Sequence, residues 1–166
     1  MGDNEFLAEL DASVYAFDST TIDLCLYLFP WAKFRNKEGA IKAHTLNDLD
    51  GNIPAWIFIT ECSVHDVNAL DHLPIEARAY YVMDKGYVDF KRLYKIAQES
   101  AAWITRAKDN MKYKRLYSAA TDRSTGIICD QTIVLLGFYF KEDYADKIRP
   151  VKYKDAETNM SRTEIG

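Results

Sequence analysis

The 166-residue chain has few of the residues and patterns that define specialised classes of protein. Seven glycines and four prolines are too few for a collagen-like or low-complexity chain. Three cysteines form an odd set without C-x-x-C spacing, so they indicate reduced thiols rather than a disulfide framework or a zinc site. The longest apolar runs, at 55–59 and 133–139, are far shorter than the roughly 20 residues of a membrane span. No secretion signal opens the chain, and we therefore expect a cytoplasmic protein without a membrane partner.

The charge of the chain is distributed unevenly. Hydrophobic residues make up 48% and charged residues 28% of the sequence, which is typical of a globular domain, and the net charge is −4. Residues 85–115, however, contain nine Lys and Arg against three Asp and Glu, a local charge of +6. On charge alone, the more common explanation of such a basic segment is a solvent-exposed helix face. Binding to the phosphate backbone of a nucleic acid would also require a local positive charge of this kind.

Apolar runs and turn residues predict the order strand, hairpin, helix, strand, helix, strand. The first strand is expected to end at Asp18, with a turn or a helix cap at 19–21, and a later short helix is expected to be capped by Ser63 or Asp66. The expected strands are 14–17, 40–49, 53–60, 79–83 and 101–105, with a hairpin turn at 50–52 and a second helix starting near Phe90.

The pattern changes beyond residue 112, where alternating residues and turns predict further strands. We therefore expect an α/β fold, in which a mixed sheet with flanking helices occupies 1–110 and an incomplete β-rich region occupies 111–166.

Two predicted strands each place an aspartate at their carboxyl end, Asp18 and Asp84. In open α/β sheets, ligands bind at this edge. Two carboxylates that converge there repel each other unless a divalent cation neutralises them, and Mg²⁺ or Mn²⁺ prefers such oxygen ligands. The alternative, that each aspartate only caps the segment after it, remains open on this reasoning.

Six segments together resemble bacterial insertion-sequence transposases of the DDE type. They are YAFDSTTIDL at 15–24, FPWA at 29–32, KAHT at 42–45, VHD at 64–66, YVMDKGYVDF at 81–90 and TRAK at 105–108. The resemblance runs from about 14 to about 158 and implies a ribonuclease H-like core with a β-rich C-terminal insertion. In that family three acids hold two divalent ions, Mg²⁺ or Mn²⁺, and the resemblance makes Asp18 the first catalytic, metal-binding acid and Asp84 the second.

The resemblance also implies a DNA partner, namely the terminal inverted repeats of an element and its target DNA, together with a homodimer and a location at the bacterial nucleoid. Phosphate contacts of this kind hold a protein in position without reading bases. The residues expected to contact DNA are Lys42, His44, Lys85, Arg106 and Lys108, and those expected at the rim of the site are His65 and Asp66.

The third acid of the family, a Glu on a helix beyond the β-rich insertion, has no counterpart in this sequence. Glu157 and Glu164 lie in what reads as a polar tail without a helical apolar face, so neither replaces it. We therefore expect a truncated piece of a transposase that is inactive alone.

Two other interpretations remain. Asp18 and Thr20 after a strand, followed by Asp84 and Asp89, faintly resemble the haloacid dehalogenase-like phosphatases, but that family has a second Asp where this chain has Thr20. A non-catalytic remnant that binds DNA or associates with itself fits the basic segment better, with Tyr113 and Tyr117 as stacking residues.

Overall fold

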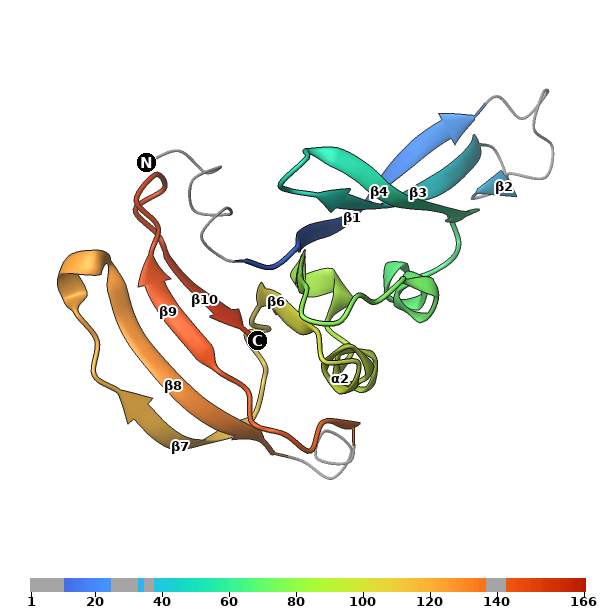
Figure 1. Ribbon diagram of the computed structural model, residues 1–166. Helices are drawn as coiled ribbons and strands as arrows, with labels where there is room; N and C mark the ends of the chain where they lie inside the picture. The colour runs from blue at the N-terminus through green and yellow to red at the C-terminus, as the bar shows by residue number, and fades with distance from the viewer. Residues whose placement is uncertain (1–10, 25–32, 35–37, 137–142) are drawn as a thin grey trace.

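A computed structural model describes residues 11–24, 33–34, 38–136 and 143–166 of the chain. Cys25 and the segment 29–32 lie outside the described residues. Within them, strands form one mixed sheet in the order β2-β3-β1-β5-β6-β10-β9-β8-β7, with β4 paired to β3 (Figure 1). The strands are β1 (Val14–Leu24), β2 (Lys33–Phe34), β3 (Glu38–Asp48), β4 (Ile53–Glu61), β5 (Tyr80–Met83), β6 (Ala102–Arg106), β7 (Tyr113–Ala119), β8 (Ile127–Leu135), β9 (Pro150–Lys154) and β10 (Ser161–Ile165).

The first half of the sheet combines two kinds of pairing. β1, β3 and β4 form an antiparallel meander, whereas β1, β5 and β6 run parallel to one another. Parallel neighbours need a crossover, and the segment between β4 and β5 and that between β5 and β6 carry the helices that provide it. This arrangement confirms the expected α/β fold class, a mixed sheet with flanking helices.

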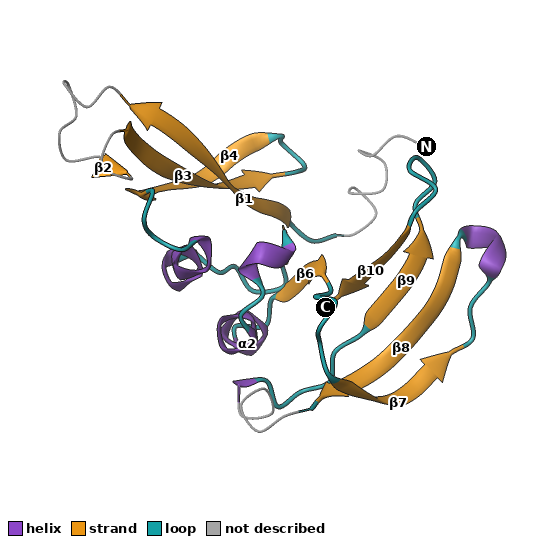
Figure 2. Cartoon of the chain, turned by 180° about the vertical axis from the view of Figure 1, so that it is seen from behind, coloured by secondary structure: helices purple, strands orange, loops and turns teal. Residues whose placement is uncertain are grey.

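Helices cover one face of this half of the sheet (Figure 2). They are the 3₁₀ helices η1 (Asp66–His72) and η2 (Lys85–Tyr87) and the α-helix α2 (Phe90–Gln98), and a further 3₁₀ turn, η3 (Arg123–Thr125), precedes β8. Asp89 caps α2, because its side chain accepts a hydrogen bond of 3.1 Å from the backbone N–H of Arg92. Leu93 and Ile96 on α2 pack into the same buried cluster as Phe17 and Trp103 of the strands. None of the helices in the described residues is long and apolar enough to span a bilayer.

The C-terminal strands continue the same sheet. β10 pairs antiparallel with β6 at two positions, Glu164 with Arg106 and Ile165 with Thr105. β9, β8 and β7 then follow as an antiparallel meander that curves away from β6 (Figure 1). The expected β-rich region is therefore present, while the division of the chain near residue 110 stays a prediction.

Three local expectations are wrong. β1 does not end at Asp18 but continues to Leu24, because β3 pairs with every residue from Tyr15 to Leu24 and replaces the expected turn or cap at 19–21. The helix after β4 starts at Asp66 with His65 at its N-cap, and no side chain caps it. Residues 161–165 form β10 rather than a polar tail.

Alternation along the strands sorts side chains between the two faces of the sheet. Phe17, Met83 and Thr105 face the helices and are at most 5% exposed. The residues that follow them, Asp18, Asp84 and Arg106, therefore project from the opposite face.

We expect the hydroxyl of Tyr81 to stabilise the turn before β5. This fully buried hydroxyl donates to the carbonyl of Pro74 at 3.0 Å and accepts from the N–H of Glu76 at 2.8 Å. Tyr81→Phe leaves both backbone groups without that partner and should lower the free energy of unfolding by about 1–3 kcal/mol, measured by urea denaturation. The matched control is Tyr80→Phe on the partly exposed face, which should change it by less than about 0.5 kcal/mol; equal effects would contradict the assignment.

Candidate functional site

The parallel pairing of β1 with β5 brings Asp18 and Asp84 together. Their register pairs Phe17 with Met83, so the next residue on each strand is an aspartate. Neighbouring strands lie about 5 Å apart, and both aspartates project from the same face of the sheet. Both side chains are exposed to solvent. The two carboxylates expected at a common edge are thus on adjacent strands, although β1 itself continues beyond the site.

Each aspartate is oriented by a backbone N–H. Asp18 Oδ1 accepts from the N–H of Ser19 at 2.8 Å, and Asp84 Oδ1 accepts from the N–H of Gly86 at 2.9 Å, which also caps η2. Asp84 Oδ2 forms an ion pair with Arg106. The Gly86 hydrogen bond, followed by the Arg106 guanidinium, holds the pKa of Asp84 below its usual value.

A row of charged residues crosses four strands at this level. Arg106 follows Thr105, the residue paired with Met83, and so lies beside Asp84. Glu164 pairs with Arg106 from the other side, across β10 and β6. The row therefore runs Asp18, Asp84, Arg106, Glu164. Burial raises the pKa of the half-buried Glu164, and the nearby Arg106 opposes that shift. The sequence alone does not predict that Glu164 lies next to Arg106, because the pairing of β10 with β6 leaves no local sequence signal.

A buried tyrosine lies close to the acids. Tyr87 is 3% exposed, its ring packs on Phe17 with centroids 4.9 Å apart, and its hydroxyl has no well-formed hydrogen bond within the described residues. Burial raises the pKa of Tyr87 to about 12, the carboxylates of Asp66, Asp18 and Asp84 add to the shift, and the Ser19 side chain opposes it. Tyr87 thus stays protonated in the core beneath the acids, packed on Phe17 and next to Ser19.

These residues fit a divalent cation as an incomplete set of ligands. Asp18 and Asp84 supply the hard carboxylate oxygens that such ions prefer. The described residues contain no group of three or more His, Cys, Asp or Glu side chains placed to hold a metal ion. At least one further ligand is needed to complete the site.

A groove of about 380 Å³ adjoins the acids on the side of Arg106. It lies between η2, the segment after β6, and β10. Four basic side chains and one acidic side chain line it, and sequence reasoning identified three of the four basic ones. The charged lining residues are Lys85, Arg106, Lys108, Arg162 and Asp109.

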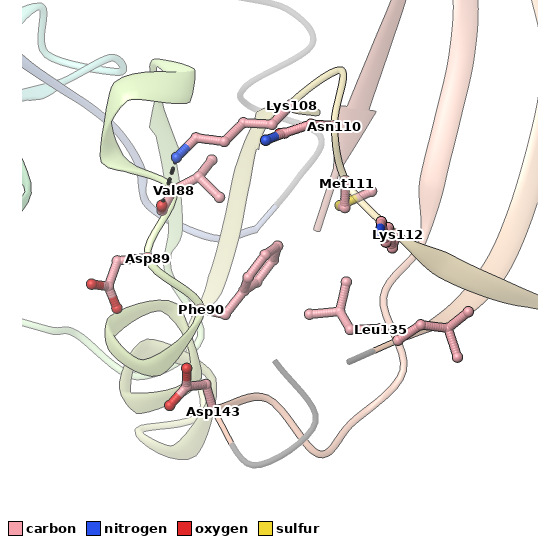
Figure 3. Close-up of a pocket in the computed structure, with 10 residues that line it drawn as sticks. Val88, Asp89, Phe90, Lys108, Asn110, Met111, Lys112, Leu135 and Asp143 are labelled. Carbon is pink, nitrogen blue, oxygen red and sulfur yellow. Dashed lines mark hydrogen bonds between the residues drawn. The ribbon is translucent and has the colours of Figure 1, made fainter. Parts of the chain in front are cut away.

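A second hollow of about 670 Å³ shares Lys108 and Met111 with this groove and reaches the start of α2 (Figure 3). Phe90, Met111 and Leu135 give it an apolar floor, and the Lys108 ammonium extends across its edge to donate to the carbonyl of Val88 at 3.1 Å (Figure 3).

Comparison with known proteins decides the family of the chain. The sequence model described as the transposase DDE domain matches residues 9–161. The chain belongs to this transposase family. Members of the family use divalent metal ions and act on DNA, which agrees with a pair of carboxylates beside a basic groove.

Relatives of this transposase domain carry corresponding names. A protein of Sinorhizobium fredii named as the transposase y4zB is 33% identical over 108 residues, covering 65% of this chain and 30% of the relative. A protein of Geobacillus stearothermophilus named as the transposase of insertion sequence element IS5377 is 27% identical over 93 residues, covering 56% and 24%. The matches thus span less than a third of either relative. Among solved structures, the piggyBac transposase in a synaptic complex with hairpin DNA matches 92% of this chain and 32% of its own, with a TM-score of 0.49 and 8% identity.

Two residues expected to contact DNA lie inside the transposase domain instead. His44 is fully buried, its Nε2 lies 3.0 Å from Thr60 Oγ1, and its ring packs between Phe17 and Phe58. A direct phosphate contact is not available to it. Lys42 is 15% exposed and binds the segment before η1, through an ion pair of 2.9 Å with Asp66 and a hydrogen bond to a backbone carbonyl.

The two residues expected at the rim also differ in surroundings. His65 is exposed at the N-cap of η1, whereas Asp66 is half-buried beside Lys42. Lys42 and Asp66 therefore fasten η1 to β3, and the exposed basic residues near the acids remain Lys85, Arg106 and Lys108.

We expect His44 to make folding stability depend on pH. Burial lowers the pKa of His44; the nearby Asp66 raises it and Lys42 lowers it further, with burial dominant. The unfolded chain takes up a proton near the ordinary pKa of about 6.5 while the folded chain resists it, so stability is complete above that pH and declines as pH falls below it. Urea unfolding measured between about pH 7 and pH 5 should show this decline, and His44→Gln should reduce its slope.

The matched control for this prediction is His65→Asn, because His65 is exposed. It should leave the slope as in the unmodified protein. A slope that His65→Asn removes, or that His44→Gln leaves intact, would refute the assignment to His44.

Proposed function

We propose that this domain supplies two metal-binding acids, Asp18 and Asp84, of a DDE transposase that cleaves DNA at the ends of an element and joins those ends to target DNA. The observation that carries the proposal is the register of β1 and β5, which makes these two acids neighbours on one face of the sheet. Two carboxylates placed side by side call for a cation between them. Among the described residues, Arg106 forms an ion pair with Asp84, and Asp18 has no ion pair.

The metal is proposed to be Mg²⁺ or Mn²⁺. When bound, it would activate the attacking oxygen and stabilise the leaving oxygen of a phosphodiester. Asp18 and Asp84 hold it, and the N–H groups of Ser19 and Gly86 keep the two carboxylates oriented. Burial keeps Tyr87 protonated over the working range of pH, with its hydroxyl next to the Ser19 side chain.

The proposed partner is DNA, namely the terminal repeats of the element and its target, in the bacterial nucleoid and with the protein as a homodimer. Lys85, Arg106 and Lys108 are exposed beside the acids, and they are the proposed phosphate contacts. Such contacts position the strand relative to the metal without reading its sequence.

A second candidate function is DNA binding without chemistry. The basic groove favours it, because it is built from residues other than the two acids. Metal dependence separates the two functions: binding to phosphate alone weakens with salt and needs no divalent ion, whereas cleavage needs both.

We expect Asp18→Asn and Asp84→Asn each to weaken Mn²⁺ binding by about tenfold or more, since each removes one of the two anionic ligands. Isothermal titration calorimetry on the folded variants provides the measurement. Asp23→Asn is the matched control, because Asp23 is an exposed aspartate on the same strand β1. It should bind Mn²⁺ like the unmodified protein.

If Asp18→Asn, Asp84→Asn and Asp23→Asn all bind Mn²⁺ with the same affinity, the two-acid site is overturned. Loss of Mn²⁺ binding in Asp18→Asn and Asp84→Asn, with salt-sensitive DNA binding retained, would separate the metal site from the groove. Nicking of a duplex that requires Mn²⁺ and both acids selects the transposase over the non-catalytic alternative.

A further inference from the structure

The basic groove is joined to the acid pair by one residue. Arg106 lines the groove and also forms the ion pair with Asp84. Both side chains of this ion pair are close to half exposed, at 47% and 45%, so the guanidinium has room to move. The groove and Asp84 therefore compete for the same guanidinium, that of Arg106.

The other basic residues of the groove differ in how free they are. The exposed Lys85 side chain forms no ion pair or hydrogen bond within the described residues, and its charge acts on the neighbouring Asp84. Lys108 donates to the carbonyl of Val88, a neutral partner. Arg162 pairs with Asp155 at 2.9 Å while remaining 41% exposed. Without a metal ion, Lys85 and Lys108 thus carry most of the uncompensated positive charge.

The two oxygens of Asp84 have different partners. Oδ1 accepts the Gly86 N–H that caps η2, whereas Oδ2 faces Arg106. A cation that binds between Asp18 and Asp84 through Oδ2 leaves this cap undisturbed. It meets the guanidinium there, and two cations on one carboxylate oxygen repel each other.

We propose that this groove binds the phosphodiester backbone of the DNA strand next to the acids, and that Arg106 becomes one of its phosphate contacts only when a divalent ion displaces it from Asp84. This rests on the proposed metal site. Lys85, Lys108 and Arg162 are the remaining contacts. A guanidinium binds phosphate oxygens through two parallel N–H donors, so the released side chain gains a strong partner in the groove.

Thermodynamic linkage makes this coupling reciprocal. If the metal ion frees Arg106 for DNA, DNA that holds Arg106 must raise the affinity of the acids for the metal by the same factor. In this arrangement, bound metal raises the affinity of the domain for the DNA strand, and bound DNA raises its affinity for the metal.

The test compares Arg106→Gln with Lys85→Gln. Fluorescence anisotropy of labelled single-stranded and duplex oligonucleotides is measured with and without Mn²⁺ at several salt concentrations, and Mn²⁺ affinity is measured by calorimetry. Lys85→Gln should weaken DNA binding with and without Mn²⁺ and lower the salt slope by about 0.7 on a single strand or 0.9 on a duplex. Arg106→Gln should do so only with Mn²⁺.

Arg106→Gln should also tighten Mn²⁺ binding in the absence of DNA, by about two- to fivefold, because it removes an exposed competing ion pair. Arg106→Lys keeps the charge but not the paired donors, so it should restore the competition with Mn²⁺ and only part of the DNA affinity. Arg123→Gln, an exposed arginine outside the groove, is the matched control and should change neither measurement.

Equal loss of DNA affinity with and without Mn²⁺ in Arg106→Gln, or an unchanged Mn²⁺ affinity, would overturn the inference. If Mn²⁺ binding still depends on Asp18 and Asp84, the proposed metal site survives that result and only its link to the groove fails. Mn²⁺ binding that is independent of both acids defeats the proposed function itself. The DNA form, single strand or duplex, whose affinity falls more in Arg106→Gln with Mn²⁺ present is the form that occupies the groove.

Discussion

The parallel pairing of β1 with β5 is the constraint on which the site depends. It places Phe17 beside Met83 in the core and, one residue later, Asp18 beside Asp84 on the open face. A slip of β1 by one residue would exchange its two faces, turning Asp18 toward the helices and Phe17 toward solvent while Asp84 stayed in place. The hydrophobic core therefore fixes the position of the carboxylates: burial of Phe17, Tyr81 and Trp103 determines where the acids lie.

The strand pattern and the two acids could be predicted from the sequence because their signals are local. Continuous apolar runs that lead into Asp18 and Asp84 identify two strands, and the turn at 50–52 identifies the hairpin. The full length of β1 could not be predicted this way, because residues 19–24 owe their extended backbone to pairing with β3 rather than to their own pattern. Local propensity gives way to such long-range pairing.

The same distinction explains the residues that were placed incorrectly or missed. The segment 40–49 has apolar and polar residues on both faces of the strand, so its pattern does not show which face His44 occupies. The packing of Phe17 and Phe58 around His44 makes it a core residue. Glu164 and Arg162 reach the site through the pairing of β10 with β6, which no sequence motif announces. Charge is also redistributed by contacts: Lys42 and Arg106 both read as free cations in the sequence, yet each faces an aspartate in the fold.

The connection between the two halves of the sheet is narrow. β10 and β6 pair at two positions, and one of these holds Arg106, the residue that contacts Asp84. Asp18, Asp84 and Arg106 all belong to β1, β5 and β6 on one side of this joint, so a bend there would move Glu164 and Arg162 on β10 relative to Arg106. The register of β10 against β6 therefore decides which charge of the C-terminal strands stands next to the Arg106 guanidinium, and a slip by two residues would exchange the carboxylate of Glu164 for the cation of Arg162.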